Sequence, residues 1–107
     1  MTGRTTNLHP DLISKLQLLE THYGKSLEIT SGYRDPEHNR DVGGVDHSEH
    51  TYDPAEGADL ACANGAERWS LVTLALQVGF ERIGIGKTFV HVGIATDKPV
   101  RVIWTYY

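Results

Sequence analysis

Apolar residues recur at helical spacing near the start of the chain, with polar residues between them. Leu12, Leu16, Leu19 and Tyr23 follow one another every three or four residues. This is the spacing of one face of an α-helix. Pro10 favours a helix start and Gly24 a stop, so the pattern predicts an amphipathic helix over residues 10–23.

A second helix is predicted in the middle of the chain. Asn64 and Glu67 form an Asn-x-x-Glu capping pattern directly ahead of the apolar run 69–78. Gly79 is placed to end that helix. Trp69, at the start of the run, is expected in the core.

The remaining apolar segments are short and are typical of β-strands. Their order around the two helices is strand, polar loop, strand, helix and then three strands. This order favours an α+β fold, with a mostly antiparallel sheet packed on two helices. The predicted strands span residues 27–33, 57–62, 80–86, 88–94 and 99–107.

Length and composition narrow the class of protein. A chain of 107 residues fits one domain, residues 1–107. Its net charge of −4 argues against nucleic acid or an anionic membrane as a partner. One cysteine, Cys62, allows no internal disulfide, and no apolar run approaches the length of a membrane span. We expect a monomer that carries no secretory signal peptide.

Charge and histidine are concentrated in the polar segment between Arg34 and Asp59. It contains eight of the 14 acidic residues and three of the six histidines. Long internal loops of this kind are usually either functional or disordered, and we favour the functional interpretation. The residues concerned are Asp35, Glu37, His38, Asp41, Asp46, His47, Glu49, His50, Asp53, Glu56 and Asp59.

Three residues at the edges of predicted strands form a candidate metal site. His50 ends the polar loop, Asp59 begins a strand, and His91 lies between apolar neighbours in TFVHVGI. Two histidines and a carboxylate can bind Zn²⁺ and leave a fourth position open. Plainer alternatives exist for each: a solvated loop histidine, a turn-capping aspartate and a half-buried strand histidine.

Four short motifs follow one another along the chain: SGYRDPEHNRDVGG (31–44), SEH (48–50), GADL (57–60) and FVHVGI (89–94). Together they resemble the zinc D-alanyl-D-alanine carboxypeptidase family of peptidoglycan peptidases. That family includes L-alanyl-D-glutamate endopeptidases and shares its fold with the hedgehog signalling domain. The resemblance covers about residues 10–94.

The resemblance implies roles for individual residues. His50, Asp59 and His91 would be the Zn²⁺ ligands, and Ser48 would help to shape the loop. Arg34 would face the substrate and stabilise charge at the scissile carbonyl, a role that suits a guanidinium. Its alternative is a structural one, tying the acidic loop to the sheet.

Two features depart from the family pattern. Eight residues separate His50 from Asp59, where the family usually has six, which makes Asp53 a rival ligand. Family members also usually carry a catalytic carboxylate three residues before the last histidine or two after it. Thr88 and Gly93 stand there, and an aspartate at position 93 is expected to leave metal binding intact.

A proton acceptor would therefore come from the polar segment. The candidates are Glu49, Glu56, Asp53 and His47, each with the alternative of being a solvated charge. We name Glu56, together with Arg34, as catalytic.

The sequence therefore predicts a zinc-dependent peptidase that hydrolyses peptidoglycan stem peptides, as a carboxypeptidase or an endopeptidase. The alternative is a weakly active or inactive zinc-containing module that binds peptidoglycan or protein. A third interpretation makes the histidines structural and the loop an interaction surface. An enzyme of the first kind would be synthesised in the cytoplasm and act at the bacterial cell wall. The sequence suits a small phage lysin or tail-associated lytic domain, and equally a domain cut from a longer chain.

Overall fold

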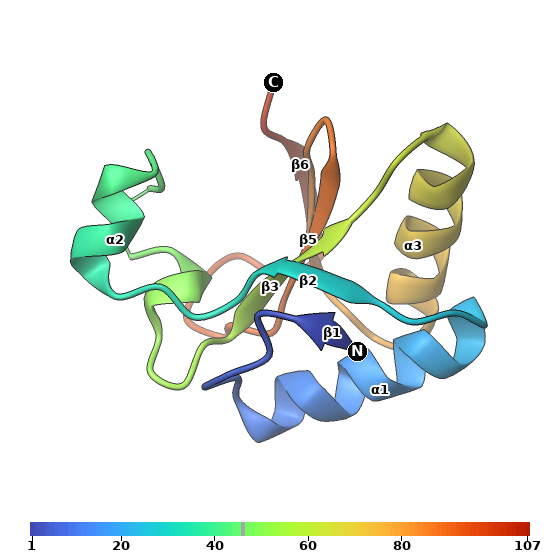
Figure 1. The fold of residues 1–107 in the computed structure, drawn as a ribbon, viewed down its shortest axis with the longest axis horizontal. Helices are drawn as coiled ribbons and strands as arrows, with labels where there is room; N and C mark the ends of the chain where they lie inside the picture. Colours follow the sequence, from blue (N-terminus) through green and yellow to red (C-terminus); the bar gives the residue numbers. More distant parts are fainter. Residues whose placement is uncertain (46) are drawn as a thin grey trace.

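Six strands form one sheet in the order β1-β2-β3-β5-β4-β6 in the computed structural model, which describes residues 1–45 and 47–107 (Figure 1). The helices are α1 (Pro10–Tyr23), α2 (Pro36–Asp41) and α3 (Gly65–Gln77), with a single 3₁₀ turn, η1 (Glu49–Thr51). The strands are β1 (Thr2–Gly3), β2 (Glu28–Ser31), β3 (Gly57–Ala61), β4 (Arg82–Ile85), β5 (Phe89–Gly93) and β6 (Val102–Thr105).

The α+β class is confirmed, but the sheet is mixed. The central pairs β2–β3, β3–β5 and β5–β4 are antiparallel, whereas the outer pairs β1–β2 and β4–β6 are parallel. β1 is parallel to β2 because α1 carries the chain back between them. β6 is parallel to β4 because it follows β5 and pairs on the far side of the β4–β5 hairpin.

The two long helices begin where the sequence predicts. Pro10 opens α1, and Gly24 follows it with a φ of 79°. The Asn64 side chain accepts a hydrogen bond from the Glu67 N–H at the start of α3. Trp69 differs from expectation, since it is 73% exposed. Leu71 and Ala75 supply the buried face of α3 instead.

One hydrophobic cluster joins α1 and α3 to one face of the sheet. Leu12, Leu16 and Leu19 of α1 are fully buried in it. Ala58 and Leu60 of β3 lie in the same cluster, as do Val90 and Val92 of β5. The alternate residues of these strands therefore point to the opposite face, where the polar segment lies.

The polar segment contains more structure than a loop. Asp35 accepts a hydrogen bond from the His38 N–H and, with Pro36, starts the short helix α2. Ser48 accepts one from the His50 N–H and starts η1, which is the shaping role expected of it. In Figure 1, α2 lies on the other side of the sheet from α3. Within the described residues, no helix is long and apolar enough to cross a membrane.

Candidate metal centre

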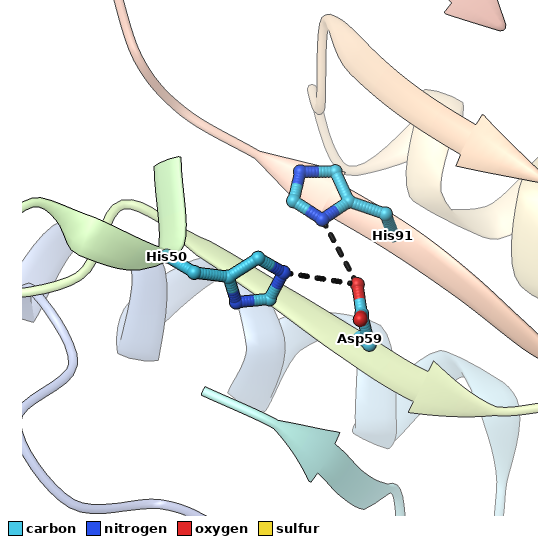
Figure 2. Close-up of side chains that lie close together, drawn as sticks. All are labelled: His50, Asp59 and His91. Carbon is cyan, nitrogen blue, oxygen red and sulfur yellow. Dashed lines mark hydrogen bonds and ion pairs between the residues drawn. The ribbon is translucent and has the colours of Figure 1, made fainter. Parts of the chain in front are cut away.

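The structure brings His50, Asp59 and His91 together, with one side-chain donor atom from each within 4.8 Å of the others (Figure 2). Asp59 and His91 are direct neighbours across β3 and β5 in the strand register. Asp59 Oδ1 lies 3.0 Å from His91 Nδ1 and 3.2 Å from His50 Nε2. All three residues are buried, although they come from three separate parts of the chain.

His50 is fixed from two sides. Its backbone carbonyl accepts a hydrogen bond of 2.8 Å from the Arg34 N–H. Its ring Nδ1 lies 2.7 Å from the Gly32 carbonyl oxygen, which can only accept. Nδ1 therefore carries the proton, and the lone pair of Nε2 faces Asp59.

The histidine rings are surrounded by acceptors. His50 faces Gly32 O and Asp59 Oδ1, and His91 faces Glu49 Oε1 and Asp59 Oδ1. A neutral imidazole has one N–H, so it can satisfy only one of its two acceptors. A cation among the three inner atoms satisfies all of them, since neutral histidine nitrogens and a carboxylate are metal ligands.

Two of the three separations between the donor atoms also fit Zn²⁺. A tetrahedral ion with ligand bonds of roughly 2.0–2.1 Å has ligand atoms about 3.3 Å apart. The two separations from Asp59 Oδ1, 3.0 and 3.2 Å, approach that value. Two nitrogens and one oxygen leave a fourth position, as catalytic zinc sites do.

The pKa values reflect burial opposed by strong pairing. Burial alone would raise the pKa of Asp59, but the hydrogen bonds from His50 and His91 hold it well below its usual range. Burial alone would lower the pKa of His91, but Asp59 and Glu49 together raise it. The cluster is thus built to hold positive charge between carboxylates.

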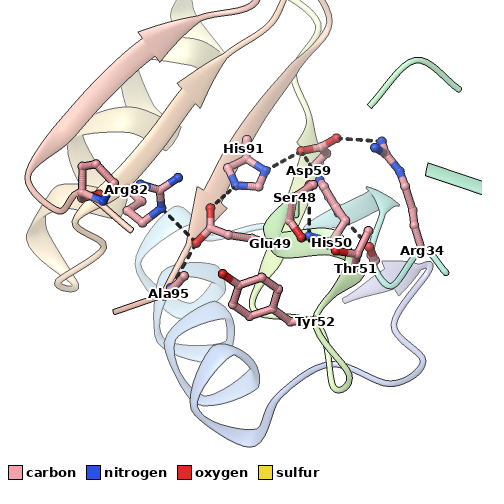
Figure 3. Close-up of polar contacts among 12 residues, drawn as sticks. Arg34, Ser48, Glu49, His50, Thr51, Tyr52, Asp59, Arg82, His91 and Ala95 are labelled. Atoms are coloured by element: carbon pink, nitrogen blue, oxygen red, sulfur yellow. Dashed lines mark hydrogen bonds and ion pairs between the residues drawn. The ribbon is translucent and has the colours of Figure 1, made fainter. Parts of the chain in front are cut away.

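Arg34 lies at the outer edge of the cluster (Figure 3). Its Nη2 is 3.8 Å from Asp59 Oδ2, the carboxylate oxygen that faces away from the histidines. Nε donates to Ser31 Oγ at 3.0 Å, and Nη1 donates to the Asn39 side-chain oxygen at 3.2 Å. The guanidinium is therefore positioned beside the site and also ties the polar segment to β2.

Glu49 is the residue whose place in the site the sequence did not reveal. It is 2% exposed, and its Oε1 accepts from His91 Nε2 at 2.9 Å (Figure 3). Burial would raise the pKa of Glu49, but His91, Ala95 N–H and Arg82 together lower it. A signal for this packing exists in Gly57 and Gly93, because glycine inside a strand marks a close approach.

The other proton-acceptor candidates lie elsewhere. Asp53 is exposed and accepts from Asn7 Nδ2 at 2.9 Å. His47 lines a surface pocket with Arg40 and Thr51. Glu56 is half-buried just before β3, and burial, with Asp97 and Glu49 nearby, raises its pKa. Among the contacts of the described residues, none joins the Glu56 side chain to the three clustered ligands.

A pocket of about 330 Å³ opens beside His91 and Glu49. Trp104 and Tyr106 form an aromatic wall, and Arg82 and Lys98 supply positive charge. The Trp104 ring centroid lies 5.6 Å from that of His91. The pocket can therefore hold an extended ligand with an anionic group next to the metal cluster.

Comparison with known families agrees with this geometry. The family model for Peptidase M15 matches residues 2–94, which is most of the chain. No curated protein matched in a separate comparison. The matched span contains His50, Asp59 and His91, the three residues that could bind a metal. The chain thus belongs to the M15 peptidase family and is a metallopeptidase.

Proposed function

We propose that this metallopeptidase uses Zn²⁺, held by His50 Nε2, Asp59 Oδ1 and His91 Nδ1. The observation that carries the proposal is the convergence of two histidine nitrogens and one carboxylate oxygen, from three buried residues, within 4.8 Å of one another. When bound, Zn²⁺ supplies Lewis-acid chemistry and makes a bound water more acidic. Asp53, the rival ligand, is remote from this arrangement because its partner is Asn7.

The substrate we propose is a stem peptide of bacterial peptidoglycan, which places the enzyme's action at the cell wall. Such peptides carry free carboxylates. The pocket beside His91 offers Lys98 as a cation and Trp104 as a flat apolar wall, and Arg82 lines it while paired with Glu49. A peptide lying there has its carboxylate near Lys98 and its backbone near the metal cluster.

Arg34 would stabilise negative charge on the scissile carbonyl oxygen. Its guanidinium is oriented by Ser31 and Asn39, and its third nitrogen, Nη2, points toward the cluster. A preorganised donor of this kind stabilises charge that develops in the transition state without reorganising during the reaction. Glu56 stays a predicted catalytic residue, and its raised pKa would help it to hold a proton.

Metal analysis together with peptide hydrolysis tests the proposal. We expect close to one Zn²⁺ per chain, and cleavage of a synthetic stem peptide at either the L-Ala–D-Glu or the D-Ala–D-Ala bond. His91→Ala should lose both metal and activity, whereas His22→Ala, which changes an exposed histidine of α1, should lose neither. Wild-type protein that retains no metal after mild dialysis would refute the zinc centre.

Cleavage of one bond and not the other assigns the enzyme as endopeptidase or carboxypeptidase. A zinc-loaded protein that cleaves neither peptide would refute the proposed substrate class while leaving the metal centre in place.

A further inference from the structure

Glu49 reaches into the core of the site from η1 and contacts three different elements. Oε1 accepts from His91 Nε2 on β5, and Oε2 accepts from the Ala95 N–H at 3.0 Å. Oε2 also pairs with the Arg82 guanidinium of β4, with Nε at 3.1 Å. Both oxygens of the carboxylate thus have hydrogen-bond or ion-pair partners, and the side chain is buried.

Two glycines make the room for Glu49. Gly57 of β3 and Gly93 of β5 face each other in the strand register. A Cβ at Gly57 would lie 2.7 Å from His91 Cε1 and 2.8 Å from Glu49 Cβ. A Cβ at Gly93 would overlap the carboxylate of Glu49 itself. The carboxylate of Glu49 therefore occupies the space in which a side chain of residue 93 would begin.

We propose that Glu49 is the positioning residue for His91, and that Glu49 and Gly93 act as a pair. By accepting from His91 Nε2–H, the carboxylate leaves the lone pair of Nδ1 facing Asp59 and His50. A carboxylate that orients a ligand histidine in this way also increases the basicity of the ligand. This inference rests on the proposed metal centre, in which His91 is a ligand.

The same geometry places the Glu49 carboxylate on the side of His91 that faces away from the metal cluster. It lies at Nε2 of the imidazole, whereas the cluster lies at Nδ1. Both carboxylate oxygens already have partners. Arg82 is itself held, because it donates to the Pro99 carbonyl and lies over the Trp104 ring with its Cζ 4.9 Å from the centroid. Glu49 is therefore fixed at the far side of His91.

This arrangement argues against the expectation that an aspartate at position 93 leaves metal binding intact. Gly93→Asp would place a second carboxylate on top of the first in a buried site. Overlap and like charge both oppose that arrangement. Removing the Glu49 side chain opens the space, and an aspartate at position 93 would then begin where the Glu49 carboxylate lay.

A double-mutant cycle tests the pairing. The variants are Glu49→Ala, Gly93→Asp and the two combined, with Glu49→Gln as a milder change that keeps the side-chain volume. Affinity is measured for Zn²⁺ alone by competition with a chromophoric chelator. We expect Glu49→Ala to weaken binding about 10–100-fold, Gly93→Asp to weaken it also, and the double variant to recover at least about tenfold over Glu49→Ala.

Two control variants match these changes. Glu37→Gln alters an exposed glutamate of the same polar segment, and it should bind Zn²⁺ like wild type. Gly65→Asp adds the same side chain where nothing lies within 4 Å of the new Cβ, and it should also bind like wild type.

The tautomer of His91 is a second measurement, and it does not depend on the overall stability of the protein. In ¹⁵N NMR spectra of the wild-type protein, recorded at a pH where the His91 ring is neutral, His91 should carry its proton on Nε2. Glu49→Ala should lose that preference and the double variant should regain it. Unchanged Zn²⁺ affinity and an unchanged His91 tautomer in both Glu49→Ala and Glu49→Gln would overturn the inference. So would a double variant that binds Zn²⁺ no more tightly than the weaker-binding of the two single variants.

These outcomes are distinct from failure of the proposed function. Wild-type protein without bound metal refutes the zinc centre. The His91 tautomer and the melting temperature, compared among wild type, Glu49→Ala, Gly93→Asp and the double variant, still decide whether residues 49 and 93 act as a pair.

Discussion

The central strands β3 and β5 have one apolar face and one polar face. On one face Ala58, Leu60, Val90 and Val92 are fully buried against the helices. On the other face Gly57, Asp59, His91 and Gly93 are buried nearly as deeply. The apolar face is stabilised by loss of contact with water. The polar face must offset the cost of burying charge, and it does so by pairing each group.

This difference shows how each face depends on the rest of the chain. The apolar face needs only residues of suitable size from α1 and α3. The polar face needs specific atoms from elements distant in sequence: Arg34 after β2, Glu49 and His50 in η1, and Arg82 in β4. A change on the apolar face should therefore affect stability, and one on the polar face should affect chemistry.

Asp59→Asn should have the largest effect on chemistry. It removes the charge that both histidines share, so we expect Zn²⁺ to be lost and peptide hydrolysis to fall to background, measured by metal analysis and by a peptide assay. Asp53→Asn is the control, because Asp53 is exposed and pairs with Asn7. The opposite order of effects would make Asp53 the metal ligand in place of Asp59.

Leu60→Ala tests the apolar face of the same strand. Leu60 is fully buried, so we expect a loss of about 2–5 kcal/mol in the free energy of unfolding, measured by urea denaturation. Zn²⁺ affinity of the folded variant should stay within a few-fold of wild type. Leu18→Ala, at a position that is 48% exposed, should lower the free energy of unfolding much less. A Leu60 variant that keeps its stability but loses its metal would contradict the division between the two faces.

Arg34→Lys sharpens the comparison at the edge of the polar face. Lysine keeps the charge but loses the planar group that contacts Ser31, Asn39 and Asp59 at once. We expect hydrolysis to fall by about 10²-fold, the size of effect seen when one transition-state donor is removed. Metal content should not change. A fall in melting temperature that accounts for the whole loss of activity would assign Arg34 a structural role only.

Glu20→Gln should give the smallest effect, at the rim of the helix-covered side. The amino group of Met1 at 2.7 Å and the Leu27 N–H at 2.8 Å hold the pKa of Glu20 below its ordinary value of 4.5. A lowered pKa stabilises the fold above the ordinary value, and this stabilisation is lost as the pH falls through the folded-state pKa.

Wild type should therefore exceed Glu20→Gln in unfolding free energy by about 1 kcal/mol or less at pH 7, and the difference should shrink toward pH 3. Urea denaturation at both pH values measures it. A difference that grows on acidification would contradict the lowered pKa.

The sequence predicted the elements whose signals are local. A helix over residues 10–23 is predictable because proline, apolar spacing and glycine agree there. The strands were placed to within two or three residues, and the last one was overextended by three at its start. β1 and α2 were missed, since two and six residues are too few to show a period. Trp69 is exposed, contrary to expectation, because the apolar run 69–78 does not show which face of the helix is covered.

The candidate site was predictable only in part. His50, Asp59 and His91 stood out through their motifs, and the structure brings them together. Glu49 was one of four candidates, and nothing in its own neighbourhood in the sequence distinguished it. Its position depends on Gly57 and Gly93, which lie on two different strands and meet only in the folded sheet.

The direct pairing of Asp59 with His91 across β3 and β5 has a consequence for assembly of the sheet. A slip of one residue between these strands would turn one ligand toward the helices and separate the pair. A metal ion held by both residues therefore reports on strand alignment, because only the correctly aligned sheet offers all its ligands. Metal binding in this protein would act as a selection step that retains the chains whose central strands are in register.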